Sequence, residues 1–125
     1  MQVHEKISVL LIGCGKMGSA LLDGWLKEDI CAHITICDPA DLPGHYSENK
    51  LISHIRDLLE ATEKYDICVI ATKPQVMEGV CLLLQSQLPL GTPILSIAAG
   101  KTIGYFENYF GAEYPIIRAM PNTPA

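Results

Sequence analysis

Three glycines near the amino terminus have the spacing of a phosphate-binding turn. Gly13, Gly15 and Gly18 read G-x-G-x-x-G within LLIGCGKMGSALLDGWL, residues 10–26. In such a turn the first glycine permits a tight reversal, the second lets the backbone approach a pyrophosphate, and the third lets the next helix pack closely. The pattern alone is weakly specific, so its meaning depends on a strand before it and a helix after it.

An acidic side chain lies at the position where a dinucleotide-binding site has one. Asp38 lies 20 residues after Gly18, at the end of an apolar run. An acid at about this spacing accepts hydrogen bonds from the adenosine ribose of a dinucleotide. Since Asp followed by Pro39 is also a common start of a turn, a purely structural role stays open. A carboxylate here would repel the 2′-phosphate of NADP, so we expect it to favour NAD.

The elements around these residues supply the required context. Five apolar runs rich in Ile and Val have the character of buried parallel strands. They span residues 6–12, 33–37, 66–71, 93–99 and 115–120. Helical patterns alternate with them, over residues 17–28, 50–62, 74–88 and 102–110. This alternation predicts an α/β fold, a doubly wound parallel sheet of the Rossmann type whose ligands bind at the carboxyl edge of the strands.

Three further loops follow expected strands and therefore reach the same edge. They read ATKPQ (71–75), AAGKT (98–102) and MPNTPA (120–125). Small residues and prolines suit a backbone that lines a flat ligand closely. Ordinary turn chemistry would explain any one of these loops alone, so only their combination favours a ligand site.

Composition excludes several classes of function. The 125 residues are 49% hydrophobic with a formal net charge of −5, which suits one domain with a sizeable core. Neither a basic cluster, nor an apolar run of membrane-span length, nor a signal-like start is visible, so we expect no nucleic-acid or membrane partner. Five cysteines without a C-x-x-C pair, and histidines without ligand spacing, predict neither disulfides nor a metal site. A reducing cytoplasm is the simplest compartment.

Taken in order, GCGKMGSALLDGWL, ATKPQ, SIAAG and RAMPNTPA resemble the N-terminal domain of pyrroline-5-carboxylate reductase along nearly the whole chain. The last stretch is the most specific of the four. The resemblance implies an NAD(P)-binding Rossmann domain over residues 1–125, with NADP or NAD as cofactor. The implied reaction is hydride transfer to the C=N carbon of 1-pyrroline-5-carboxylate, which gives L-proline in the last step of proline biosynthesis.

The resemblance also implies that more chain follows in the family. Family members continue with a sixth strand and a helical domain that forms the dimer and holds most of the substrate. We therefore expect these residues to be the part of a homo-oligomeric enzyme that precedes the sixth strand. No catalytic residue is identified in this sequence. We also find no convincing donors for the substrate carboxylate here.

Family knowledge, carried over by position, assigns cofactor contacts. The pyrophosphate turn comprises Gly13, Cys14, Gly15, Lys16, Met17 and Gly18. The adenosine ribose would lie near Asp38 and Pro39, and the rest of the cofactor would be lined by Ala71, Thr72, Lys73, Pro74, Ala98, Ala99 and Gly100. The nicotinamide end would lie near Pro121 and Asn122.

Two departures from the family pattern bear on these assignments. Asp38-Pro39 stands where many members have a small polar residue or an Asn-Arg pair, which puts a preference for NADP in doubt. Many members also have a cofactor-contacting asparagine before strand three, but residues 55–61 read IRDLLEA, so that contact is not carried over. Two alternatives stay open: another reductase on the same domain, such as a hydroxyacid dehydrogenase, and a non-catalytic nucleotide-binding domain.

Overall fold

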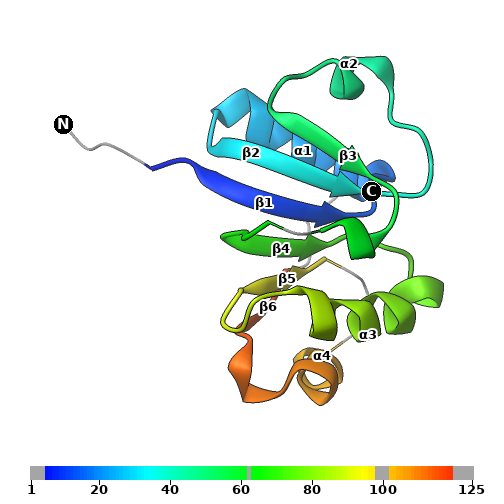
Figure 1. The fold of residues 1–125 in the computed structure, drawn as a ribbon, viewed down its shortest axis with the longest axis vertical. Helices are drawn as coiled ribbons and strands as arrows, with labels where there is room; N and C mark the ends of the chain where they lie inside the picture. The colour runs from blue at the N-terminus through cyan, green and yellow to red at the C-terminus, as the bar shows by residue number, and fades with distance from the viewer. Residues whose placement is uncertain (1–4, 62, 98–101, 120–125) are drawn as a thin grey trace.

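Six strands form one parallel sheet in the computed structural model, which describes residues 5–61, 63–97 and 102–119. The strands are β1 (Ile7–Ile12), β2 (Cys31–Cys37), β3 (Ile52–Ile55), β4 (Ile67–Ile70), β5 (Ile94–Ser96) and β6 (Ile116–Arg118). Their order across the sheet is β3-β2-β1-β4-β5-β6 (Figure 1). The direction of winding reverses between β1 and β4, and this confirms the predicted doubly wound parallel sheet.

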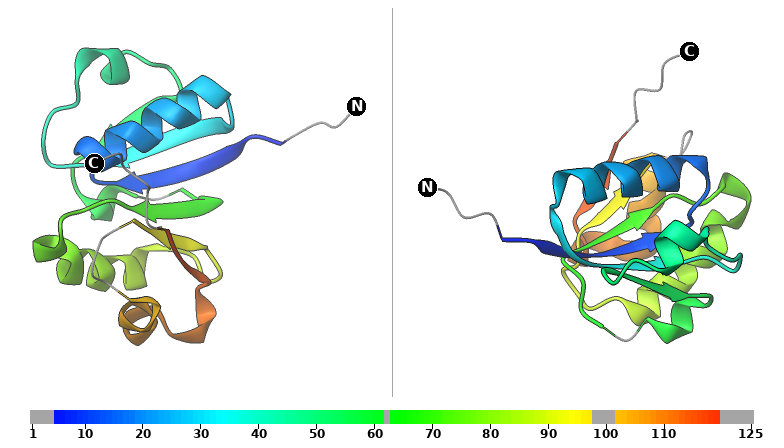
Figure 2. Two further views of the ribbon diagram at one scale, coloured as in Figure 1. Left: turned by 180° about the vertical axis from the view of Figure 1, so that it is seen from behind. Right: turned by 90° about the horizontal axis from the view of Figure 1, so that it is seen from above.

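Helices cover both faces of this sheet. The α-helices are α1 (Lys16–Glu28), α2 (Gly44–Ser47), α3 (Met77–Gln87) and α4 (Ile103–Phe110). Short 3₁₀ turns are η1 (Leu58–Glu60), η2 (Pro74–Val76) and η3 (Gly111–Glu113). Helix α1 lies on one face, whereas α3 and α4 lie on the other (Figures 1 and 2). Right-handed crossovers on either side of the reversal produce this arrangement.

The position of β1 at the centre of the sheet explains why residues 9–12 form an uninterrupted apolar run. Val9 and Leu11 pack with Leu22 of α1 in one cluster, whereas Leu10 and Ile12 pack with α3 and α4 in the other. These four of the six side chains of β1 are buried. Because successive side chains of a strand point to opposite faces, a strand between two helical layers needs apolar residues at every position. Each such side chain contributes roughly 1.5–3 kcal/mol through burial.

The helix predicted over residues 50–62 is wrong. Strand β3 occupies part of this stretch, pairing Ile34 with Ile52 and Cys37 with Ile55, and η1 follows it. Apolar residues at 51, 55, 58 and 59 fit a helical period, but Leu59 is 61% exposed. Pairing with β2 satisfies the backbone of a stretch too short to show a clear strand pattern, and so tertiary contacts override the local period. The sheet therefore has six strands within the described residues, one more than the sequence predicted.

The long polar loop over residues 38–49 is anchored by a short helix that the sequence did not indicate. Tyr46 of α2 is buried, and its hydroxyl donates to the carboxylate of Asp23 on α1 at 2.5 Å. Burial, together with the negative charge of Asp23, raises the pKa of Tyr46 to about 12. The phenol therefore stays protonated at neutral pH and holds the loop against the α1 layer.

Two glycines are required where α1 leaves the sheet. Gly13 has φ +90°, and a Cβ there would lie 3.0 Å from the Ala71 carbonyl oxygen. A Cβ on Gly18 would lie 2.5 Å from the carbonyl oxygen of Gly13. Both neighbours are backbone atoms, which have little freedom to move. The first turn of α1 can therefore approach the sheet this closely only without side chains at these positions.

We predict opposite stability effects for two glycine substitutions in α1. Gly18→Ala forces a methyl group onto a backbone carbonyl and should lower the free energy of unfolding by about 1–3 kcal/mol. Gly24→Ala, at an exposed position with nothing within 4 Å, should raise it by about 0.5–1 kcal/mol through helix propensity. Urea unfolding of both variants measures this, and a Gly18→Ala variant as stable as the wild type would contradict the packing argument.

Candidate functional site

A cleft of about 670 Å³ opens at the carboxyl edge of the sheet, around the point where the winding reverses. Its walls come from the turns after β1, β2, β3 and β4 and from one side of η2 and α3. The lining comprises residues 12–15, 37–39, 56–58 and 71–73, with Gln75, Val76, Val80 and Leu83. Crevices at this topological position bind ligands in open α/β sheets.

The turn between β1 and α1 forms the floor of the cleft. Gly15 is exposed, serves as the N-cap of α1 without a side-chain hydrogen bond, and has nothing within 4 Å of the place of a Cβ. The N–H groups in the first turn of an α-helix have no intrahelical partners, and the helix dipole is positive there. This end of α1 therefore offers donors and free space to an anionic group.

Hydrogen bonds fix this turn to the neighbouring strands. The Gly13 N–H donates to the Cys37 carbonyl oxygen at 2.9 Å, and the Ala71 N–H donates to the Ile12 carbonyl oxygen at 2.8 Å. The Cys14 N–H donates to Oδ2 of Asp38 at 2.8 Å. The ends of β1, β2 and β4 are thereby held together, so that the cleft floor is formed before any ligand binds.

Asp38 is held in a defined orientation at the end of β2. Its Oδ1 accepts from the Ala40 N–H at 2.9 Å while Oδ2 accepts from Cys14, and its carbonyl oxygen bonds Nε2 of His54 at 2.8 Å. Because a carbonyl oxygen only accepts, His54 carries a proton on Nε2. Each carboxylate oxygen has a second lone pair. Asp38 can therefore still accept hydrogen bonds from ligand hydroxyls.

Two thiols line the cleft, but neither is a nucleophile at neutral pH. Burial raises the pKa of Cys14, partly opposed by a hydrogen bond from Ser19. Burial, with smaller contributions from Asp57 and Asp38, raises the pKa of Cys37 to about 11. Since the thiolate is the reactive form, both groups stay inert. The cleft thus offers N–H donors and a carboxylate, which suits binding rather than covalent chemistry.

One wall of the cleft is apolar and accessible. Val76 is 54% exposed and Leu83 is 39% exposed, and Val80 lies between them on α3. Leu58 of η1 adds to the same lining. Accessible apolar side chains beside a polar turn can hold the flat face of a ring.

The structure brings eight of the predicted site residues together in the cleft. They are Gly13, Cys14, Gly15, Asp38, Pro39, Ala71, Thr72 and Lys73. Gly18 is buried in the first turn of α1, and Lys16, Met17 and Pro74 follow the lining residues in the chain without lining the cleft. Outside the described residues lie Ala98, Ala99, Gly100, Pro121 and Asn122. A cofactor-binding role for all of them stays a prediction.

Sequence reasoning missed the wall that follows β3. Arg56, Asp57 and Leu58 line the cleft there. Asp57 accepts from the Leu59 N–H and Glu60 accepts from the Asp57 N–H, which forms a capping box. The spacing of Asp57 and Glu60 could have indicated that a helical turn begins at this point. Assigning the whole stretch to one helix hid that signal.

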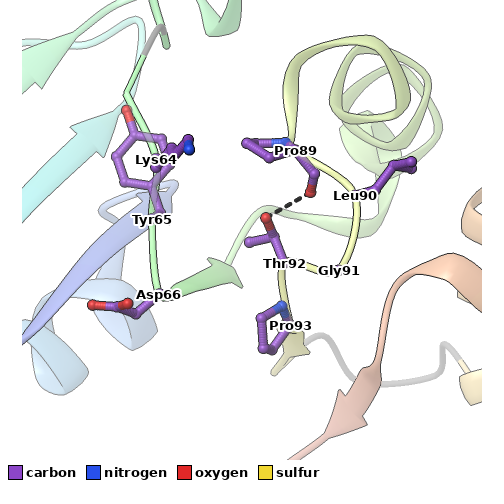
Figure 3. Close-up of a pocket in the computed structure, with 8 residues that line it drawn as sticks. All are labelled: Lys64, Tyr65, Asp66, Pro89, Leu90, Gly91, Thr92 and Pro93. Atoms are coloured by element: carbon purple, nitrogen blue, oxygen red, sulfur yellow. Dashed lines mark hydrogen bonds between the residues drawn. The ribbon is translucent and has the colours of Figure 1, made fainter.

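A second depression, of about 380 Å³, lies at the opposite edge of the sheet (Figure 3). Residues 64–66 and 89–93 line it. Its polar groups serve the fold: Thr92 Oγ1 donates to the Pro89 carbonyl oxygen at 2.7 Å, and Oδ2 of Asp66 accepts from the Ser8 N–H at 2.8 Å. Thr92 and Asp66 are therefore already bonded within the fold, unlike the start of α1 in the cleft.

The described part of the chain offers neither a metal centre nor a membrane-spanning helix. No group of three or more His, Cys, Asp or Glu residues within it could hold a metal ion. None of its helices is both long and apolar enough to cross a membrane.

The reversal of winding, the glycine turn before α1 and the acid after β2 together define a dinucleotide-binding domain of the Rossmann type. The chain belongs to the family described as NADP oxidoreductase, coenzyme F420-dependent, whose match covers residues 8–100.

Three similar proteins are pyrroline-5-carboxylate or pyrroline carboxylate reductases. The pyrroline-5-carboxylate reductase of Pseudomonas aeruginosa is 33% identical over 123 residues, which cover 94% of this chain and 44% of that protein. The reductase structure from Coxiella burnetii has a TM-score of 0.83 at 25% identity, covering 96% of this chain and 46% of that one. The Plasmodium falciparum structure, with NADP bound, has a TM-score of 0.76 at 28% identity, covering 98% and 45%.

These findings confirm the resemblance to the N-terminal domain of pyrroline-5-carboxylate reductases. The chain spans about half the length of the relatives it matches.

We predict that Gly15→Val removes dinucleotide binding without unfolding the domain. The new side chain meets no protein atom at its Cβ and extends into the space at the helix terminus. Affinity for the dinucleotide should fall by about tenfold or more, which is about 1.4 kcal/mol. Isothermal titration calorimetry measures the change, and circular dichroism verifies the fold.

The same substitution at Gly24 is the matched control. Gly24 lies in the same helix, is exposed and also has nothing within 4 Å of a Cβ, but it is away from the cleft. Its valine variant should keep the wild-type affinity to within about twofold. A folded Gly15→Val variant with unchanged affinity would show that the turn is not the phosphate site.

Proposed function

We propose that this chain is the cofactor-binding part of an NAD(P)H-dependent reductase that converts 1-pyrroline-5-carboxylate to L-proline. The observation that carries the proposal is the position of the cleft. It lies over the glycine turn of a chain that is 33% identical to a pyrroline-5-carboxylate reductase along 94% of its length. The NADP in the structurally similar Plasmodium falciparum protein supports the same class of cofactor.

The residues of the cleft would bind and orient the cofactor. The N–H groups at the start of α1 would hold the pyrophosphate, and Asp38 would accept from the adenosine ribose. When bound, NADH or NADPH supplies the hydride that reduces the C=N carbon of the substrate. A protonated imine is electrophilic, so the protein needs no nucleophile. Protonated Cys14 and Cys37 agree with that requirement.

The remaining features of the proposal concern the whole protein. Substrate-holding groups and the homo-oligomer interface are assigned to the portion of the matched relatives that lies outside the matched region. The five cysteines all lie among the described residues and form no disulfide there, which supports a cytoplasmic location, since a reducing compartment disfavours disulfides.

We predict that residues 1–125 bind the reduced cofactor but do not reduce the imine at a useful rate. Without the rest of the enzyme, the substrate is not held in line with the nicotinamide, and such positioning can lower a barrier by roughly 7–11 kcal/mol. The assay follows loss of reduced nicotinamide absorbance with 1-pyrroline-5-carboxylate. The full-length Pseudomonas aeruginosa relative serves as the positive control.

The same assay separates the alternative functions. Joining residues 1–125 to the remaining portion of that relative should restore turnover of the imine. A folded chimera that instead oxidises a hydroxyacid when supplied with NAD+ or NADP+, seen as a gain of reduced nicotinamide absorbance, would favour a dehydrogenase. One that binds cofactor and turns over neither substrate would favour a nucleotide-binding domain. Turnover by residues 1–125 alone at the full-length rate would contradict the assignment of substrate binding to the portion of the relatives outside the matched region.

We predict that Asp38→Ser shifts cofactor preference toward NADP. Removing the carboxylate removes its repulsion of the 2′-phosphate, and the ratio of the two Kd values should shift by about threefold to tenfold. Asp66→Ser is the matched control, because Asp66 also accepts from a backbone N–H but lies at the opposite edge. Titration of NADH and NADPH measures both variants. An equal shift in the control would exclude a local effect of Asp38.

A further inference from the structure

The wall missed by sequence reasoning contains the only arginine among the described residues that line the cleft. Arg56 donates from Nη1 to the Pro39 carbonyl oxygen at 2.9 Å. Its Nη2 bonds the carboxylate of Asp41 at 2.5 Å. The guanidinium is therefore bonded to the residue directly after Asp38, the group we assign to the ribose.

Hydrogen bonds to Glu60, part of the capping box, fix the position of the Arg56 backbone. Oε2 of Glu60 accepts from the N–H groups of both Arg56 and Asp57, each at 3.0 Å. Pro39 is a second point of attachment, through the side chain. The Arg56 side chain is still 55% exposed, so a ligand in the cleft can reach it.

The guanidinium of Arg56 is already paired with a carboxylate at this end of the cleft. Asp41 is bonded to Arg56, and Asp38, Asp57 and Lys73 line the cleft nearby. The hydrogen bond from Arg56 lowers the pKa of Asp41, so that the pair is ionised at neutral pH. A phosphomonoester carries a charge of about −1.5 to −2 at neutral pH. The 2′-phosphate of NADP would have to displace Asp41 to reach Arg56, whereas NAD has only a hydroxyl there.

We propose that Asp41 is a specificity-determining residue that favours NAD over NADP, because it occupies the arginine that would otherwise bind the 2′-phosphate. Arginine binds phosphate bidentately through its planar fork, and one carboxylate on that fork competes for the same donors. The inference rests on the proposed function, since it requires a dinucleotide in this cleft. It adds a second determinant to Asp38, on a residue that does not itself line the cleft.

The test measures the Kd of NADH and of NADPH for four proteins: the wild type, Asp41→Asn, Arg56→Gln and the double variant. We expect tighter NADH binding in the wild type. Asp41→Asn should shift the ratio of the two Kd values by about fivefold or more in favour of NADPH. Adding Arg56→Gln should abolish that shift in the ratio. The shift caused by Asp41→Asn should become smaller at high salt, because Arg56 and Asp41 are exposed and their charges are screened.

A matched control separates a local effect from a change in net charge. Glu48→Gln removes the same charge from an exposed residue at the end of α2, in the same loop. The ratio of the NADH and NADPH Kd values of this variant should stay within about twofold of the wild-type ratio. An equal shift in Glu48→Gln would overturn the inference.

The remaining outcomes are also decisive. Tight NADH binding with an unshifted ratio in Asp41→Asn, or a wild type that prefers NADPH, would overturn the inference alone. Absence of binding by either nucleotide would contradict the proposed function, and this inference with it.

Discussion

The close approach of α1 to the sheet is the constraint on which the site depends. The helix begins so near the turn after β1 that Gly18 has no room for a methyl group beside the Gly13 carbonyl oxygen. The same turn lies against the backbone at Ala71, after β4. One backbone contact region therefore joins β1, β4 and α1, at the place where the winding of the sheet reverses.

This constraint produces a functional surface without any reactive side chain. Because the turn is tight and Gly15 at the start of α1 has no side chain, the first N–H groups of α1 face open space above the sheet edge. Asp38 bonds to the same turn through Cys14, so the carboxylate at the end of β2 has a fixed place beside those donors. At the glycine turn the cleft is thus a prepared binding surface made of backbone donors and a fixed carboxylate.

The parts of this arrangement that follow from local sequence could be predicted. The glycine spacing, the apolar strands and Asp38 each have a physical signature within a few residues, and the cleft contains eight of the predicted site residues. Strand β3 could not be predicted, because its four residues gain their stability from pairing with β2 rather than from their own pattern. The Arg56–Asp41 pair joins residues from separate loops, so no spacing in the sequence indicates it.

The central claim is that a nicotinamide dinucleotide binds across the glycine turn at the carboxyl edge of the sheet. Amide chemical shifts in a ¹⁵N-labelled sample, titrated with NADH, test it most directly. The account predicts large, saturable shifts at Gly13, Cys14, Gly15 and Asp38, and unchanged positions at Asp66, Gly91 and Thr92 on the opposite edge. Shifts confined to the opposite edge, or none at all in the folded protein, would contradict it.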